Sequence, residues 1–106
     1  MFAVIYRWRI IPGREAQFEA GWRAGTERIA AEFGGWGSRL HYAGEQVYIA
    51  YAQWPDEATW RRAMETRMRH SDDDARRKYQ DAIEPGTFET LCAAPVVADM
   101  LQRCPP

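Results

Sequence analysis

Apolar and polar residues alternate over residues 4–11 in a way that predicts a strand with two unlike faces. One face carries only large apolar or aromatic side chains: Val4, Tyr6, Trp8 and Ile10. The other face mixes isoleucine with arginine: Ile5, Arg7, Arg9 and Ile11. Pro12-Gly13 ends this strand, because proline cannot donate to a sheet. Neither face suits plain exposure to water, so we expect both faces to be covered.

A helix with one apolar stripe is predicted from Glu15 to Phe33. The large apolar residues of this segment follow the helical period: Phe18, Trp22, Ile29 and Phe33. Gly21 and Gly25 lie on the same stripe, where each glycine costs about 1 kcal/mol relative to alanine. They therefore indicate either close packing on a sheet or space beside a ligand.

The remaining pattern predicts three more strands and an interrupted helical region. The strands are expected at residues 36–42, 46–54 and 87–93, with a short hairpin loop between the first two. Pro55-Asp56 begins a helix whose buried side includes Trp60. This helix breaks near His70 and restarts at Ser71, which three aspartates follow. The order predicts one α+β domain over residues 1–106, a ferredoxin-like βαββαβ antiparallel sheet with the helices on one face.

The second face of the predicted sheet needs a partner of its own. A bare face that carries Ile5 and Ile11 would be an exposed apolar patch. A second copy of the same sheet is the simplest cover, which predicts a symmetric homodimer through the open face. Arg7 and Arg9 are then expected at the rim or paired with carboxylates, since an unpaired buried charge is costly.

Composition and charge exclude several classes of function. The 106 residues have a formal net charge of −1 and a pI of about 6.1, so the basic surface of a nucleic-acid-binding protein is absent. No apolar run approaches the roughly 20 residues that span a bilayer, and no secretory signal is apparent. We therefore expect a cytoplasmic protein without a membrane partner. Cys92 and Cys104 share no metal-ligand spacing with His41 and His70, so we expect free thiols and no metal site.

Three segments together resemble the antibiotic biosynthesis monooxygenase family: VIYRWRIIPG (4–13), GGWGSRLHYAGE (34–45) and YIAYAQWPDEATW (48–60). The resemblance covers nearly the whole chain. It implies a dimeric α/β barrel with a pocket between the sheet and the helices of each subunit. It also implies that some relatives oxidise polycyclic quinols or anthrones without metal or flavin, whereas others degrade haem.

The residues that mark haem-degrading members of this family are not kept here. Tyr6 stands where those members have an asparagine, Ala63 or Met64 where they have a tryptophan, and Asp73 near their histidine ligand. Ala63 also replaces a histidine that many members carry on the second helix. The resemblance therefore disfavours haem degradation and leaves His70 as the one alternative ligand.

The leading hypothesis is a cofactor-independent monooxygenase that acts on an aromatic quinol or anthrone. Tyr6 and His70 are the candidate catalytic residues, because such chemistry needs a group that helps to ionise a phenol. Trp8, Trp22 and Trp60 are the candidate substrate-binding walls, although the same aromatics could serve only as core. The clusters Arg61-Arg62 and Arg76-Arg77-Lys78 indicate a solvated helix surface or attraction of an anionic aromatic substrate. The alternative hypothesis is a non-catalytic dimeric module that binds a small apolar molecule or serves a stress response.

Overall fold

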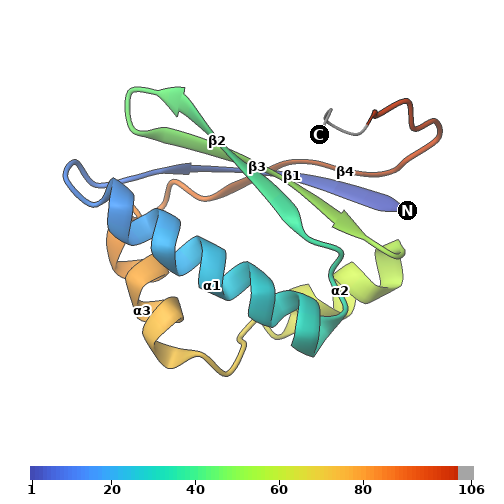
Figure 1. Ribbon diagram of the computed structural model, residues 1–106, viewed down its shortest axis with the longest axis horizontal. Coiled ribbons are helices and arrows are strands. Elements are labelled where there is room, and N and C mark those ends of the chain that lie inside the picture. The colour runs from blue at the N-terminus through green and yellow to red at the C-terminus, as the bar shows by residue number, and fades with distance from the viewer. Residues whose placement is uncertain (103–106) are drawn as a thin grey trace.

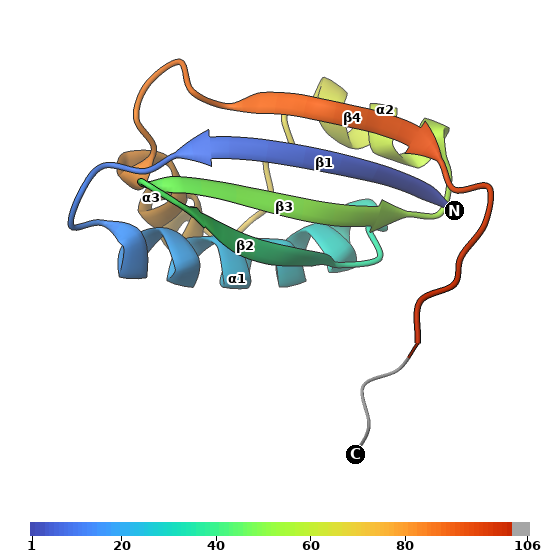
Figure 2. The same cartoon turned by 90° about the horizontal axis from the view of Figure 1, so that it is seen from above.

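A four-stranded antiparallel sheet carries three helices on one face, and its other face is uncovered (Figures 1 and 2). The structure is a computed structural model and describes residues 1–102. The strands are β1 (Phe2–Arg9), β2 (Ser38–Gly44), β3 (Val47–Trp54) and β4 (Glu89–Pro95). The helices are α1 (Glu15–Phe33), α2 (Glu57–Glu65) and α3 (Asp73–Ala82). The strand order β2-β3-β1-β4 confirms the predicted ferredoxin-like α+β fold.

The central strand β1 has the two faces that its sequence predicts. Phe2, Val4, Tyr6 and Trp8 are all buried against the helices, and the residues between them are half-buried on the open face. Tyr6 pairs with Ala50 of β3 and with Thr90 of β4. The β4 register shifts after Ile5, so the edge strand carries a bulge at that point.

Two strands begin two residues later than predicted, because local turns take their first residues. Gly37 has a φ of 94°, which keeps residues 36–37 outside β2. Before β4, the Thr87 hydroxyl donates to the Glu84 carbonyl at 2.7 Å and closes a turn that contains Gly86, whose φ is 78°. The hairpin turn between β2 and β3 is Glu45-Gln46, both with positive φ.

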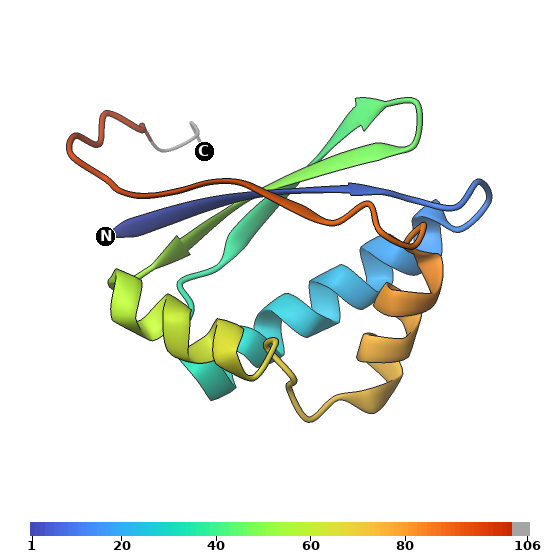
Figure 3. The same ribbon diagram turned by 180° about the vertical axis from the view of Figure 1, so that it is seen from behind.

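Glycines on α1 allow this helix to approach α3 and His70. A Cβ at Gly21 would lie 2.6 Å from the Tyr79 nitrogen and 2.9 Å from the Ala75 oxygen, both of them backbone atoms of α3. A Cβ at Gly25 would lie 3.1 Å from His70 Nε2. The expectation that these glycines pack on the sheet is therefore wrong. They pack on α3 and on the segment before it, and Figure 3 shows α1 beside α3. Both glycines also line the cavity between the sheet and the helices, in keeping with the alternative of space beside a ligand.

The break between α2 and α3 is confirmed near the predicted residues. α2 ends in two bonds typical of a Schellman motif, from Met68 N to the Ala63 oxygen and from Arg67 N to the Met64 oxygen. Arg67 and Met68 both have positive φ, although neither is glycine. Asp72 then caps α3, since its carboxylate accepts from the Ala75 N–H at 3.0 Å. This geometry holds residues 66–72 beside the helix-covered face of the sheet.

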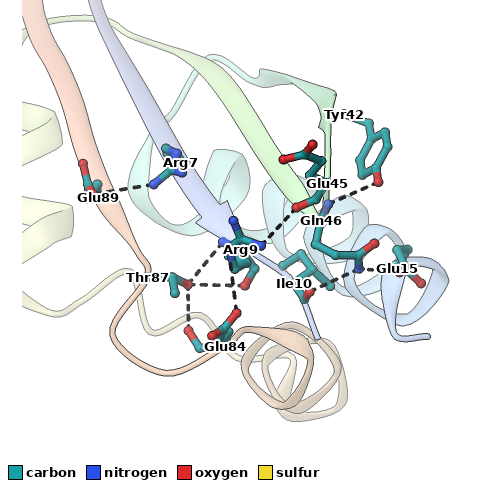
Figure 4. A network of polar contacts seen from close by, with 10 residues as sticks. All are labelled: Arg7, Arg9, Ile10, Glu15, Tyr42, Glu45, Gln46, Glu84, Thr87 and Glu89. Carbon is teal, nitrogen blue, oxygen red and sulfur yellow. Dashed lines mark hydrogen bonds and ion pairs between the residues drawn. The ribbon is translucent and has the colours of Figure 1, made fainter. Parts of the chain in front are cut away.

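Charges on the open face of the sheet are paired, as Figure 4 shows. The Arg7 guanidinium lies 3.7 Å from the Glu89 carboxylate, and the Arg9 guanidinium lies 3.9 Å from that of Glu84. Arg9 also donates to the Glu45 carbonyl at 3.2 Å. The prediction that both arginines would be paired with carboxylates is confirmed.

Residues 96–102 follow β4 without helix or strand and carry highly exposed apolar side chains: Val97, Met100 and Leu101. Cys92 is an exposed free thiol, and Cys104 lies outside the described residues. Among residues 1–102, no helix is long and apolar enough to span a membrane.

Candidate functional site

A cavity of about 570 Å³ lies between the sheet and the helices. Its room comes from β3, whose inner face reads Tyr48, Ala50, Ala52 and Trp54. Because two alanines lie between the two large aromatic residues, the middle of the strand leaves space open on the helix-covered side of the sheet. The helices and the segment between α2 and α3 supply the remaining walls.

Four of the five predicted site residues line this cavity together: Tyr6, Trp8, Trp22 and His70. They come from β1, from α1 and from the segment before α3. The fifth, Trp60, is not among the lining residues. It packs on Phe2 and donates its indole N–H to the Tyr6 hydroxyl at 2.8 Å. Trp60 therefore positions Tyr6 from behind and forms no wall.

Two tyrosine hydroxyls meet the cavity, and each is held by a tryptophan. Trp60 Nε1 donates to Tyr6, and Trp8 Nε1 donates to the Tyr79 hydroxyl at 2.7 Å. Because each phenol oxygen accepts from an indole, its own hydrogen stays available for a ligand. Burial raises the pKa of Tyr6 to about 12 and also raises the pKa of Tyr79. At neutral pH both phenols are therefore hydrogen-bond donors and not bases.

His70 is also arranged as a donor. The Asp72 backbone N–H points at His70 Nδ1 across 3.2 Å, so this nitrogen must accept. The neutral ring then carries its proton on Nε2, which lies beside Gly25. Burial lowers the pKa of His70, and the negative charge of Glu32 opposes this shift. A neutral imidazole with a protonated Nε2 can orient a ligand oxygen, but it does not take a proton there.

Two buried side-chain nitrogens in the described part of the chain have no hydrogen-bond partner, and both belong to this site. They are Trp54 Nε1 and Arg76 Nε, and both residues line the cavity. Either nitrogen can only donate. A buried donor without an acceptor is uncommon in native proteins and calls for an explanation. These two nitrogens are themselves closed off from the cavity, so it is other atoms of Trp54 and Arg76 that line it.

Arg76 departs from the solvated surface expected for residues 76–78. Its side chain is 19% exposed, whereas that of Arg77 is 71% exposed and pairs with Asp74 on the outside. The helical period explains the difference, because Arg76 precedes Tyr79 by three residues and Ile83 by seven. That spacing places Arg76 on the apolar side of α3. In the sequence, residues 76–78 form one basic cluster, which does not separate Arg76 from its exposed neighbours.

Sequence reasoning missed Tyr79 and Trp54 as site residues. Both follow the apolar spacing of their elements, a signal that indicates packing in the core. What the pattern could not show is that a cavity opens beside them. His41, a second histidine, is exposed and pairs with Ile49 on the open face, outside the lining of this cavity.

No group of three or more His, Cys, Asp or Glu side chains within residues 1–102 is arranged to hold a metal ion. The residues around the cavity are instead aromatic and small apolar side chains with the donors described above.

Comparison with known proteins agrees with this architecture. The sequence model of the family described as antibiotic biosynthesis monooxygenase matches residues 1–83. SnoaB from Streptomyces nogalater, a cofactor-independent oxygenase, has a similar structure with a TM-score of 0.68 at 15% identity, over 95% of this chain and 97% of SnoaB. NE2512 from Nitrosomonas europaea, a protein of unknown function, gives 0.66 at 17% identity over 97% and 95% of the two chains. No curated protein sequence matches the chain.

Proposed function

Because this chain belongs to the antibiotic biosynthesis monooxygenase family, we propose that it is a cofactor-independent monooxygenase that oxidises an aromatic quinol or anthrone in the cavity. The observation that carries this proposal is the pair of phenol O–H donors, Tyr6 and Tyr79, in one aromatic cavity. The cavity volume of about 570 Å³ falls within the range of small-molecule sites. A flat ligand of two or three fused rings suits such a space.

The proposed reaction needs stabilisation of an oxyanion more than it needs a protein base. An anthrone that loses one proton becomes an enolate, and this electron-rich anion reacts with molecular oxygen to give a hydroperoxide. Loss of water from the hydroperoxide then leaves the quinone, so one O₂ yields one carbonyl oxygen and one water. Hydrogen bonds from Tyr6 and Tyr79 to the enolate oxygen favour the ionised substrate, as an oxyanion hole does.

Within this proposal the roles of the predicted residues become specific. Tyr6 is a catalytic donor that Trp60 positions, and Tyr79 is a second donor that Trp8 positions. His70 donates from Nε2 and orients the substrate. Since no lining group is a base at neutral pH, the substrate proton leaves to water. No metal or organic cofactor takes part in the proposed reaction.

Oxygen consumption tests the proposal. The protein is supplied with 1,8-dihydroxyanthrone or naphthohydroquinone in chelator-treated buffer, and oxygen uptake is followed with an electrode. We expect Tyr6→Phe and Tyr79→Phe each to lower kcat by about 10- to 100-fold, somewhat less than the loss of an oxyanion-hole donor at its strongest. Tyr51→Phe, on the open face of the sheet, is the matched control and should retain activity. Uptake no faster than the uncatalysed rate, or a double variant as fast as wild type, would reject the assignment.

A second candidate function is supported by one observation, the absence of a base among the lining residues. A donor-rich cavity without a base can bind an aromatic molecule and leave it unchanged. This non-catalytic module, in a stress response or elsewhere, would show saturable binding of a quinone with no oxygen uptake from its reduced form. The two readouts therefore separate the candidates.

We also propose a homodimer formed through the open face of the sheet. Ile5 and Ile49 lie on this face, which none of the described helices covers, and Arg7 is the cross-strand partner of Ile49. Figure 4 shows the ion pairs of Arg7 and Arg9. Two such faces pressed together would hide apolar surface without burying a lone charge. Sedimentation velocity at micromolar concentration tests this, and a single monomeric species would contradict it. The single domain over residues 1–106 and the cytoplasmic location remain predictions.

A further inference from the structure

We propose that the ligand of the cavity is an aromatic carboxylate, and that its ionised acid group pairs with Arg76. This inference deepens the proposed function and rests on it only for the aromatic character of the ligand. Oxidation of a quinol or anthrone does not itself require an acid group on the substrate. A preference for such a group would come from the residues that line the cavity.

Arg76 is the most buried of the arginines that line the cavity. Its side chain is 19% exposed, and one guanidinium nitrogen pairs with Asp73, whose side chain is 74% exposed. Its Nε is closed off without a partner, whereas other atoms of the same side chain line the cavity. The positive charge of Arg76 therefore lies beside whatever occupies the cavity.

Charged residues are distributed unevenly between the cavity and the rest of the chain. The chain has 15 acidic and 14 basic residues, so acidic groups are not scarce. The lining of the cavity nevertheless includes Arg67, Arg69 and Arg76 and not one aspartate or glutamate. Within the described chain, Arg76 pairs with the exposed Asp73, and Arg67 and Arg69 form no salt bridge. A positive cavity in a slightly negative protein indicates an anionic occupant.

The permanent charge of arginine indicates which kind of acid group the ligand carries. An arginine stays charged at any accessible pH, so its matching partner is a group that is ionised before the reaction begins. A phenol, with an ordinary pKa near 10, does not meet this condition, whereas a carboxylic acid does. Arg76 and Tyr79 are one helical turn apart on α3, which puts roughly 5–6 Å between their Cβ atoms. One ring system can therefore present an oxygen to Tyr79 and a carboxylate to Arg76.

Equilibrium binding of matched ligands tests the proposal. Anthraquinone-2-carboxylate is compared with anthraquinone-2-carboxamide, which has the same shape and no charge, and the naphthalene-2-carboxylate and carboxamide pair supplies a smaller scaffold. Quenching of intrinsic tryptophan fluorescence reports binding, since three tryptophans line the cavity. We expect wild type to prefer the carboxylate by about 10- to 100-fold, the range of hydrogen bonds to charged groups.

Variants on neighbouring residues of α3 make the test specific. Arg76→Gln should abolish the preference and leave the affinity for the carboxamide nearly unchanged, and Arg76→Lys should keep part of the preference. Arg77→Gln removes a charge from the same helix but outside the cavity, and it should keep the full preference. Thermal unfolding followed by circular dichroism checks that each variant is folded.

The outcomes separate this inference from the proposed oxygenation. The quinones are already oxidised, so their binding does not depend on turnover. A carboxylate preference without oxygen uptake would support this inference and reject the oxygenase. Oxygen uptake without any preference would do the reverse. Equal affinity for both members of each pair, no binding of either carboxylate, or a preference that survives in Arg76→Gln would overturn the proposal.

Discussion

The two faces of the sheet treat charged and polar groups in opposite ways. On the open face, Arg7 and Arg9 meet the carboxylates of Glu89 and Glu84 (Figure 4). On the helix-covered face, three arginines line the cavity and no aspartate or glutamate does. The same chain that pairs the charges of its open face thus leaves only basic groups among the charged residues of its cavity. The difference indicates that the open face suits a second copy of the sheet and that the cavity suits an anionic ligand.

The largest expected effect is loss of the dimer that we propose to form through the open face. Ile49→Lys puts an ammonium group directly opposite Arg7 of β1 on the proposed interface, where each of two symmetric copies would bury an unpaired charge at about 3–5 kcal/mol. We expect the dimer to weaken more than 100-fold and sedimentation velocity to show monomers. Ala31→Lys, at an exposed position on α1, is the control and should leave the assembly unchanged. A variant that sediments as wild type would exclude this face as the interface.

A smaller effect is expected where the helices cover the other face. Gly21→Leu places a side chain against the backbone of α3, which a Cβ alone would already approach to 2.6 Å. α1 and α3 must then separate, and we expect the free energy of unfolding to fall by about 3 kcal/mol. Urea denaturation measures this loss. Ala20→Leu adds more carbon at the neighbouring exposed position and should change stability by less than about 0.5 kcal/mol.

The smallest effect concerns the buried phenol of Tyr6 at high pH. Its pKa of about 12 in the folded protein exceeds the value near 10 of an exposed tyrosine, so the folded state keeps a proton that the unfolded state loses. Its contribution is complete below pH 10 and declines by about 2–3 kcal/mol as pH rises through 12. Urea titrations at pH 8 to 11.5 should show a shallower decline for Tyr6→Phe. Parallel curves for the two proteins would mean that Tyr6 is not buried as described.

Tyr6→Phe also has a cost at neutral pH that the alkaline experiment must subtract. The substitution leaves the Trp60 indole N–H without its acceptor, which costs about 1–3 kcal/mol. The comparison therefore concerns the slope of stability against pH and not its absolute value.

The fold was predictable because its signals are local. The alternation around Tyr6 and Trp8 and the helix start at Pro55-Asp56 depend on a few residues, and the structure confirms them. α3 is capped by Asp72, one residue after the predicted restart at Ser71. The paired state of Arg7 and Arg9 followed from the cost of burying a lone charge. The two late strand starts arose from local turns, one at Gly37 and one that the Thr87 hydroxyl closes onto the Glu84 carbonyl, which the alternation of apolar residues does not show.

The site was predictable only in part. The pattern pointed to Tyr6, Trp8, Trp22 and His70, and the structure brings these four to one cavity. It did not show that His70 faces the Asp72 N–H and so carries its proton on Nε2, because a tautomer depends on the neighbour of each nitrogen. It also missed the donor role of Tyr79, whose tryptophan partner lies 71 residues away.

By itself the sequence determined which side chains face inward, where the helices begin and end, and which charges needed partners. These properties depend on the period of strands and helices and on the hydrophobic effect, which act at every position of the chain. Only the tertiary structure decided that Ala50 and Ala52 form the floor of a cavity and that Arg76 turns toward it. The cavity and the residues that line it depend on how several elements pack together, so they cannot be predicted from any single segment of the chain.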